Sequence, residues 1–211
     1  SEHASNVLPW FILQKEMGIV VDYIPLNENN EVTIDNLNKV FDKDVKAVSI
    51  AHITNVVGDI RDIKSIAKIC HDHNALIVVD AAQSIAHEKI DVTLMDIDFM
   101  AFSGHKMYGP TGIGILYGRF NLLTELKPLE YGGGMNAIFN SDGYVELKDL
   151  PDKLEAGTPN IEGVLGLAES IKYIGNIGLK GKTRTEKLEL ITKYYNDGYY
   201  LTVEVKGATE G

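Results

Sequence analysis

Residues 98–118 read Asp98-Phe-Met-Ala-Phe-Ser-Gly-His-Lys-Met-Tyr-Gly-Pro-Thr-Gly-Ile-Gly-Ile-Leu-Tyr-Gly118, and they place a lysine in a polar, glycine-rich turn between two apolar runs. Both runs are short and bounded by turn-forming residues, which predicts buried strands at 99–102 and 113–117. Lys106 then lies at a strand end. Most lysines in such a position simply extend into solvent, but the neighbours of Lys106 favour a functional role.

These neighbours supply what a reactive amine needs. Ser103 and His105 can donate hydrogen bonds to an anion, and Gly104 and Gly109 let the backbone approach a ligand closely. Enclosure among apolar strands would favour the uncharged, nucleophilic amine. The turn therefore has the properties of a site where a lysine forms a Schiff base with a carbonyl compound.

The segment 103–117 closely resembles the cofactor-lysine segment of class V, fold-type I pyridoxal-phosphate (PLP) enzymes, and it is most similar to that of the SUF-type cysteine desulfurases and selenocysteine lyases. The resemblance covers about residues 2–180. It implies that Lys106 binds PLP as a Schiff base and moves the Cα proton of the substrate.

Apolar strands alternate with amphipathic helices along the chain, which predicts an α/β fold with a mainly parallel sheet. The resemblance implies a three-layer sandwich. Residues 1–180 would form the PLP-binding large domain, incomplete at its N-terminus, and residues 181–211 would begin a truncated C-terminal small domain. Further strands are expected at 19–24, 45–51, 76–80 and 201–205, and helices at 33–41, 62–72, 119–126, 161–174 and 184–195, with another helix ending at Gly18.

Composition restricts the partners. With 211 residues, 45% of them hydrophobic, the chain can bury a core, and its net charge of −10 opposes nucleic acid or an anionic membrane as the main partner. No run approaches the roughly 20 apolar residues of a membrane span. A single cysteine, Cys70, rules out an internal disulfide and fits a reducing compartment, so we expect a cytoplasmic protein, or an organellar one in a eukaryote.

Asp80 ends an uninterrupted apolar run, Leu76-Ile-Val-Val-Asp80, which is typical of a central parallel strand. An aspartate at such a position can be a helix cap. It can also accept a hydrogen bond from a pyridinium nitrogen and keep that nitrogen protonated, so that the ring accepts electrons. Together with Lys106, the second role is favoured. By resemblance, Gln83 lies beside the phenolic oxygen of PLP.

Two more residues gain a role from the resemblance. His3, in Glu2-His-Ala-Ser-Asn-Val-Leu-Pro-Trp10, reads as an ordinary cap or surface histidine by its chemistry, but it matches the family histidine that stacks on the pyridine ring. The family often has a second histidine where this chain has Ala4. Asn55 usually would cap a turn; the resemblance places it near the phenolic oxygen.

The stretch Leu154-Glu-Ala-Gly-Thr-Pro-Asn160 reads as a loop that leads into a helix, with Thr158 or Asn160 as the cap. A helix amino end can bind phosphate. By resemblance, Thr158 contacts the phosphate of the partner subunit's PLP, while Ser103 and His105 hold the phosphate of their own subunit. This implies a homodimer.

Two motifs suggest other sites and are rejected. Cys70-His-Asp-His73 contains metal-ligand types, but these side chains cannot all point one way from a helix end. Gly112-Ile-Gly114 is not a dinucleotide-binding turn, because it opens a strand and not a helix. We therefore expect no metal, and expect Cys70 to be a small buried residue.

The resemblance implies a cysteine desulfurase that converts L-cysteine to L-alanine and passes the sulfur, through an enzyme persulfide, to an acceptor protein for iron-sulfur cluster assembly or another sulfur-transfer pathway. The sulfur-accepting cysteine and the arginine that binds the substrate carboxylate are not in this chain. Since the chain also opens with Ser1, we expect a fragment that is inactive or nearly so by itself. Another class V PLP enzyme (aminotransferase, lyase or epimerase) and a non-catalytic scaffold on the same fold are the alternatives.

Overall fold

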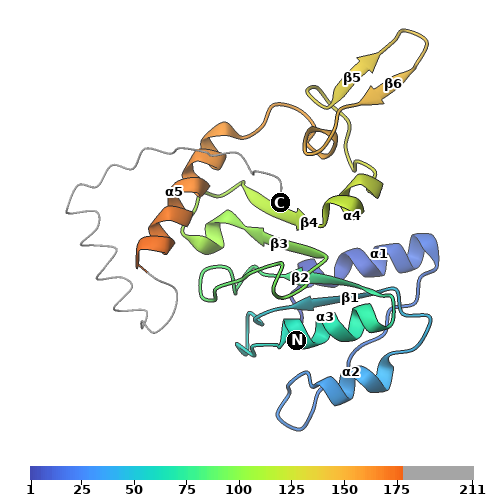
Figure 1. Ribbon diagram of the computed structural model, residues 1–211, viewed down its shortest axis with the longest axis vertical. Helices are drawn as coiled ribbons and strands as arrows, with labels where there is room; N and C mark the ends of the chain where they lie inside the picture. Colours follow the sequence, from blue (N-terminus) through green and yellow to red (C-terminus); the bar gives the residue numbers. More distant parts are fainter. Residues whose placement is uncertain (178–211) are drawn as a thin grey trace.

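The computed structural model describes residues 1–177, which form a four-stranded mixed sheet with helices packed on it, and a separate two-stranded hairpin (Figure 1). The strands are β1 (Ala47–Ala51), β2 (Leu76–Asp80), β3 (Phe99–Ser103), β4 (Gly114–Gly118), β5 (Asn136–Phe139) and β6 (Val145–Leu147). The helices are α1 (Leu8–Met17), α2 (Ile34–Val40), α3 (Ile63–Asp72), α4 (Phe120–Glu125) and α5 (Ile161–Ile177), with 3-10 helices η1 (Ala4–Asn6), η2 (Gly104–Met107) and η3 (Asp152–Leu154).

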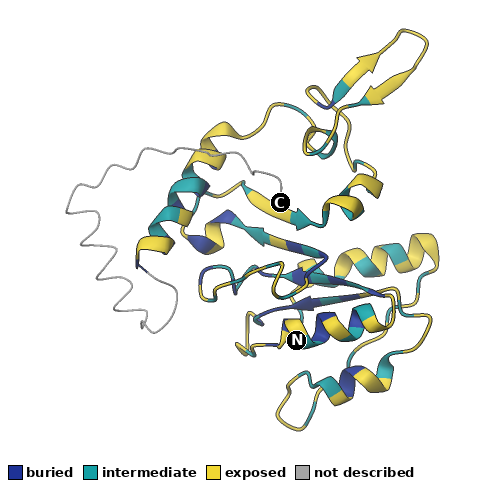
Figure 2. Ribbon diagram, viewed as in Figure 1, coloured by how far each residue is buried: buried dark blue, intermediate teal, exposed yellow. Residues whose placement is uncertain are grey.

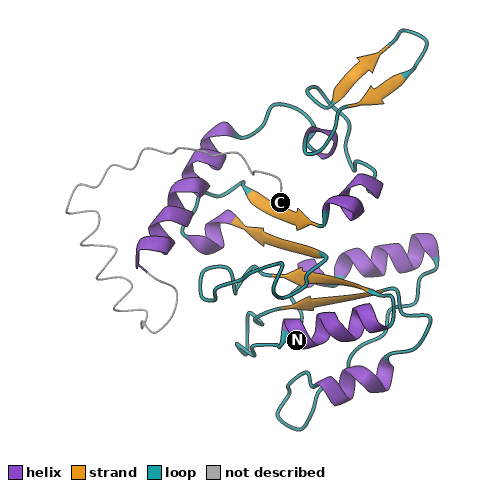
Figure 3. Ribbon diagram, viewed as in Figure 1, coloured by secondary structure: helices purple, strands orange, loops and turns teal. Residues whose placement is uncertain are grey.

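The sheet has the order β1-β2-β3-β4, in which β1, β2 and β3 are parallel and β4 runs antiparallel to β3 at the edge. The β1-to-β2 connection contains α3, as expected for parallel neighbours, which cannot be joined by a tight turn. The prediction of a mainly parallel α/β sheet is confirmed. Figure 3 shows the helix between β1 and β2 that the apolar periodicity predicted, while residues 81–98, which connect β2 to β3, contain no helix.

The main core lies between the sheet and α3. Side chains alternate along β2, so that Ile77 and Val79 are both buried on the face that meets Ile66 and Cys70 of α3. β1 and β2 are the most deeply buried part of the sheet (Figure 2). Full burial of each large aliphatic side chain contributes about 1.5–3 kcal/mol, so this layer fixes the sheet on which the strand ends are arranged.

The opposite face of β1 meets the N-terminal segment. Ser49 points away from its buried neighbours Val48 and Ile50, and its hydroxyl donates a 2.6 Å hydrogen bond to Asn6 Oδ1 in η1. The sheet therefore has α3 on one side and η1 on the other, which is the layered arrangement expected for this fold class.

A second apolar cluster fastens α5 to the lysine turn. Met107 of η2 is buried with Ala86, Leu167 and Ile174, and the last two belong to α5. The helix approaches closely, because a Cβ on Gly166 would clash with the ring of Pro110. The turn that carries Lys106 is thus held between the sheet and a long helix.

Most of the predicted elements within residues 1–177 are confirmed. Gly18 ends α1 with a φ of 72°, Thr33 caps α2, and β2 has the predicted bounds. The predicted helix at 184–195 and strand at 201–205 lie outside the described residues. Among residues 1–177 there is no helix with the length and apolar character needed to traverse a lipid bilayer.

The predicted strand at 19–24 is wrong. This segment is not helical, but it pairs with no strand of the described sheet, and Val20 and Tyr23 are 80% and 62% exposed. A short apolar run becomes a strand only when a neighbouring strand accepts its hydrogen bonds, and the sequence of the run does not contain that information.

The β5–β6 hairpin was not predicted, although its turn carries a recognisable signal. Asp142 and Gly143 lie between the two strands, and Gly143 has a φ of 92°, which glycine adopts without strain. The amide of Asn140 donates to the carbonyl oxygen of Tyr144 (2.9 Å) and closes the hairpin. The hairpin projects away from the four-stranded sheet (Figure 1).

Candidate active site

The predicted site residues gather at one edge of the sheet because three parallel strands end there. The register places Ala51, Asp80 and Ala101 side by side on β1, β2 and β3. The amide of His52 donates to the carbonyl oxygen of Asp80 (2.9 Å), and the amide of Ala81 donates to that of Ala101 (2.9 Å). The loops that leave the three strands therefore start from neighbouring points, where open α/β sheets bind their ligands.

The lysine turn is a 3-10 helix that begins directly after β3. Residues three positions apart share one face of such a helix, so Gly104 and Met107 are buried while His105 and Lys106 are exposed. The turn is closed by two backbone hydrogen bonds, from Gly104 N to Ile113 O (2.8 Å) and from Gly109 N to Gly104 O (2.9 Å). Lys106 is thus presented from a rigid base.

Two expectations for Lys106 have different outcomes. Its place at a strand end is confirmed, since β3 ends at Ser103. Its enclosure among apolar strands is wrong, because the residue is exposed in this chain. Ser103 is half-buried and leaves the turn without a side-chain cap, so its hydroxyl is not used to hold the local backbone.

Asp80 serves the local structure with one oxygen only. Its Oδ1 accepts a 2.9 Å hydrogen bond from the amide of Ala82 and so caps the turn that follows β2. No hydrogen bond to its Oδ2 forms within residues 1–177. The capping role and the cofactor role are therefore compatible, since the second oxygen can accept a hydrogen bond from a ligand. Gln83 lies half-buried in the same turn.

His3 lies on the segment that crosses the end of β1. Its ring caps η1: the amide of Ser5 donates to Nδ1 (3.2 Å), and Ser5 Oγ lies 3.1 Å from the same atom. A backbone amide can only donate, so Nδ1 is an acceptor and the neutral ring carries its proton on Nε2. The cap role is thus observed, and the exposed ring leaves the predicted stacking role open as a prediction.

Asn55 is exposed at the tip of the loop that follows β1. This loop is fixed below its tip, because Thr54 is 2% exposed and its hydroxyl accepts a 3.0 Å hydrogen bond from the amide of Asp59. A second bond, from Gly58 N to Thr54 O (3.1 Å), closes the turn around Asn55. Asn55 is therefore held at the same edge of the sheet as Asp80.

Thr158 is exposed in the loop before α5, and it does not cap that helix. The cap is Asn160, whose Oδ1 accepts from the amide of Gly163 (2.9 Å) and whose Nδ2 donates to the carbonyl oxygen of Gly112 (3.1 Å). The second bond ties the loop to the segment before β4. The expected contact of Thr158 with a partner subunit's cofactor stays a prediction.

His52 was not among the predicted site residues. It follows β1 directly, is 5% exposed, and has a buried Nδ1 atom without a hydrogen-bond partner within the described residues. Burial lowers the pKa of His52, and the charge of Glu88 opposes this only in part. The ring is therefore neutral near pH 7. Its position after a buried strand was a signal that could have marked it.

The structure agrees with the rejection of Cys70-His-Asp-His73 as a ligand cluster. Cys70 is fully buried in the core, His71 lies beside Asp98, and His73 Nδ1 donates to the carbonyl oxygen of Ile69 (2.9 Å). Burial raises the pKa of the Cys70 thiol to about 12, and the charge of Asp98 adds to this effect. Within residues 1–177, no three His, Cys, Asp or Glu side chains are grouped closely enough to hold a metal ion.

Known proteins resemble this chain over nearly its whole length. The sequence profile of the aminotransferase class-V family matches residues 1–197. A "Probable cysteine desulfurase" of Halalkalibacterium halodurans is 44% identical over 181 residues, which cover 84% of this chain and 44% of that protein. A "Cysteine desulfurase" of Shigella sonnei is 38% identical over 186 residues, which cover 88% of this chain and 46% of that protein.

Solved structures agree with these sequences. The apo structure of a cysteine desulfurase from Thermococcus onnurineus has a TM-score of 0.82 at 38% identity, and the match covers 92% of this chain and 48% of that one. A crystal structure of a cysteine desulfurase from Escherichia coli has a TM-score of 0.81 at 36% identity, over 84% of this chain and 44% of that one. The chain spans less than half the length of these relatives.

The profile matches residues 1–197, which is more than half of the chain, and the two solved structures have TM-scores above 0.8. The chain therefore belongs to the aminotransferase class-V family.

Proposed function

We propose that the protein containing this chain is a PLP-dependent cysteine desulfurase, which converts L-cysteine to L-alanine and transfers the sulfur to an enzyme cysteine. The observation that carries the proposal is the position of two residues at the same edge of the sheet. Asp80 ends β2, and Lys106 lies just beyond the end of the neighbouring parallel strand β3. The similarity to several cysteine desulfurases supports the choice of substrate.

The residues at this edge fit PLP chemically. The cofactor needs an amine for its aldehyde, a carboxylate for its ring nitrogen and donors for its phosphate. Lys106 is exposed and supplies the amine, and Asp80 has an oxygen that is not used in the turn. Ser103 and His105 precede Lys106 in the same turn and supply donors for the phosphate, together with the amino end of η2.

PLP, when bound, supplies an electron sink that takes up the electron pair left when the substrate Cα proton departs. Asp80 would accept a hydrogen bond from the ring nitrogen and keep it protonated, which is its contribution to that sink. Lys106 would hold the aldehyde carbon and then accept and return the Cα proton. His3 would cover one face of the ring, and Asn55 and Gln83 would donate to its phenolic oxygen.

The sulfur acceptor must be a cysteine thiolate outside this chain. Cys70 is the only cysteine of the sequence, and it is fully buried with its thiol pKa raised to about 12, so it cannot attack a substrate. In the proposed step the Cβ–Sγ bond of the substrate breaks and an S–S bond to the thiolate forms. The substrate carbon skeleton then leaves as alanine after protonation at Cβ.

We also propose that the protein is a homodimer. Thr158 is exposed in front of α5 and is free to reach a second subunit, which supports a homodimer with shared phosphate contacts.

We place residues 1–180 in the PLP-binding large domain and residues 181–211 at the start of the small domain. Persulfide chemistry requires reduced thiols, so we propose a cytoplasmic enzyme that delivers sulfur to an acceptor protein, for iron-sulfur cluster assembly among other uses.

The test uses the intact protein with L-cysteine and a thiol reductant. Desulfuration produces alanine and sulfide in equal amounts, and both are measured in the same sample. Replacement of Lys106 by alanine should abolish both products. Amino transfer to a keto acid without alanine release would instead identify another class-V chemistry, and a folded protein that binds no PLP would identify a scaffold.

A further inference from the structure

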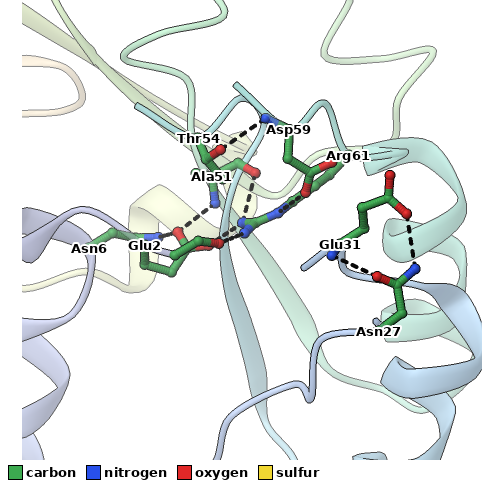
Figure 4. A network of polar contacts seen from close by, with 9 residues as sticks. Glu2, Asn6, Asn27, Glu31, Ala51, Thr54, Asp59 and Arg61 are labelled. Atoms are coloured by element: carbon green, nitrogen blue, oxygen red, sulfur yellow. Dashed lines mark hydrogen bonds and ion pairs between the residues drawn. The ribbon is translucent and has the colours of Figure 1, made fainter. Parts of the chain in front are cut away.

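A buried ion pair joins the N-terminal segment to the loop that follows β1. Glu2 Oε1 accepts a hydrogen bond from Arg61 Nη1, and the two side chains are only 19% and 2% exposed (Figure 4). Their charges are thus largely removed from water, where an arginine is stable only with full compensation. The pair lies next to the candidate site but includes none of its predicted residues.

Glu2 is held by three donors from three parts of the chain. Besides the bond from Arg61, its Oε2 accepts from the backbone amide of Ala51 (2.8 Å) and from Asn6 Nδ2 (2.7 Å). β1 is the edge strand of the described four-stranded sheet, and the amide of Ala51 donates to Glu2 and not to a neighbouring strand. All three contacts need an acceptor at Glu2, and a carboxylate accepts at both oxygens.

Arg61 is also held by several parts of the chain. Its Nη1 also donates to the carbonyl oxygen of Ala51 (3.2 Å), and its Nη2 donates to Ser1 Oγ (2.8 Å). Its Nε lies 3.5 Å from Asp59 Oδ2, and its backbone amide donates to the carbonyl oxygen of His52 (3.0 Å). The side chain and the backbone amide of Arg61 therefore together hold the end of the loop 52–61 against the end of β1.

This network connects two segments that carry predicted cofactor residues. His3 directly follows Glu2 in the chain, and Asn55 lies in the loop whose base Arg61 holds. We propose that Glu2, held in place by Arg61, is a positioning residue that sets the place of the His3 ring over the PLP ring. The inference rests on the proposed function, since it requires that PLP binds at this edge of the sheet.

Glu2→Gln is the substitution that tests this pair most specifically. Glu2→Gln keeps the size of the side chain and one acceptor, but it turns an NH2 group toward Arg61 or toward the donors of Ala51 and Asn6. At least one donor is then left facing another donor, so the attachment of the segment 1–7 to β1 is weakened, and the bond from Ser49 to Asn6 remains. Asp72→Asn is the matched control, because it neutralises one carboxylate in the exposed pair with Lys68, away from the site.

The first readout needs no cofactor. Amide hydrogen exchange of PLP-free intact protein should be roughly tenfold faster in residues 1–7 and at Ala51 in the Glu2→Gln variant, with β2 unchanged, because only local contacts are lost. Asp72→Asn should leave the exchange of these residues as it is. Unaltered exchange of residues 1–7 in the Glu2→Gln variant would overturn the inference.

The second readout separates positioning from general stability. PLP affinity and the visible circular dichroism of bound PLP are measured for Glu2→Gln, His3→Ala and the double variant. Since Glu2 acts through His3, Glu2→Gln should weaken PLP binding roughly tenfold in the native background and have little effect in the His3→Ala background. Equal losses in both backgrounds would show a merely structural role and overturn the inference.

The experiment distinguishes a failure of the proposed function from a failure of the positioning role. If the unsubstituted protein binds no PLP, the proposed function fails; if it binds PLP and the two backgrounds respond equally, only the positioning role fails. Should Glu2→Gln not fold, Arg61→Lys takes its place in the same cycle. That variant keeps the charge beside Glu2 but cannot reproduce the contacts with Ala51 O and Ser1, so the same non-additivity is expected.

Discussion

His71 Nε2 lies 2.9 Å from Asp98 Oδ2, so the last turn of α3 is joined to the residue before β3 at the amino edge of the sheet. Asp98 is 3% exposed, and the same oxygen accepts a 2.9 Å hydrogen bond from the amide of Ile77 in β2. The other ring nitrogen of His71 lies 2.9 Å from Asp96 Oδ2. The imidazole is therefore placed between two carboxylates, far along the strands from the candidate site.

This contact predicts a pH-dependent stability. Burial by itself would lower the pKa of His71, but the hydrogen bonds and charges of Asp98 and Asp96 outweigh it, so the pKa is raised. A raised folded-state pKa stabilises the fold fully below the unfolded value of about 6.5, and this contribution is lost as the pH rises through the folded value. Thermal unfolding of the native protein and of His71→Gln, from about pH 5 to about pH 9, should show a difference that shrinks with increasing pH.

The His71→Gln comparison contains its own control. Other groups that titrate in this range contribute equally to both proteins, so the difference between the two melting curves isolates His71. Two curves that stay parallel over the whole range would show that the imidazolium contributes nothing to folding.

Gly104→Ala should damage the lysine turn. A Cβ at this position would lie 2.8 Å from Ile113 Cγ2, 3.1 Å from Ile113 O and 3.2 Å from Pro110 O, and two of these three atoms are backbone. We expect a loss of about 1–3 kcal/mol in the free energy of unfolding, measured by denaturant titration, together with weaker capture of PLP because the turn carries Lys106. Gly133→Ala is the matched control, since its Cβ would meet nothing within 4 Å. Equal stability of the two variants would contradict the packing described for the turn.

Asp80→Asn separates the structural and the chemical role of this residue. The amide oxygen of asparagine can still accept from Ala82 N, so the turn and the free energy of unfolding should stay within about 0.5 kcal/mol of the native values. The negative charge for the cofactor ring nitrogen is lost, and kcat/KM with L-cysteine should fall roughly 100-fold or more. A variant with native kcat/KM would show that Asp80 is a turn cap and nothing else.

The elements that the sequence could predict are those whose signal is local. β2 has four consecutive apolar residues that follow a turn and lead to the carboxylate of Asp80, and α3 has an amphipathic repeat with Asp62 as its cap, so their bounds follow from pattern alone. The run at 19–24 has a similar composition, but strand formation there depends on a partner that the described residues do not supply. Exposure of Lys106 was missed for a related reason, because burial of a turn depends on what packs over it.

The residues at the candidate site also differ in whether the sequence could predict them. Asp80 and Lys106 could be proposed from sequence because parallel strands that alternate with helices end at one edge, and the register confirms that β1, β2 and β3 do so. The Glu2–Arg61 pair could not be proposed, because its members are 59 positions apart and neither is in a recognisable motif. Long-range pairs of this kind follow from the fold, and sequence spacing does not reveal them.

The central claim is that Lys106 binds PLP, and borohydride reduction tests it most directly. The intact protein is incubated with PLP, reduced and digested, and the modified peptide is identified by mass spectrometry, with Lys153, which donates to the carbonyl oxygen of Thr124, as an internal reference lysine. We expect the phosphopyridoxyl group on Lys106 and not on Lys153. A folded protein that carries the label on other lysines, with Lys106 unmodified, would contradict the account.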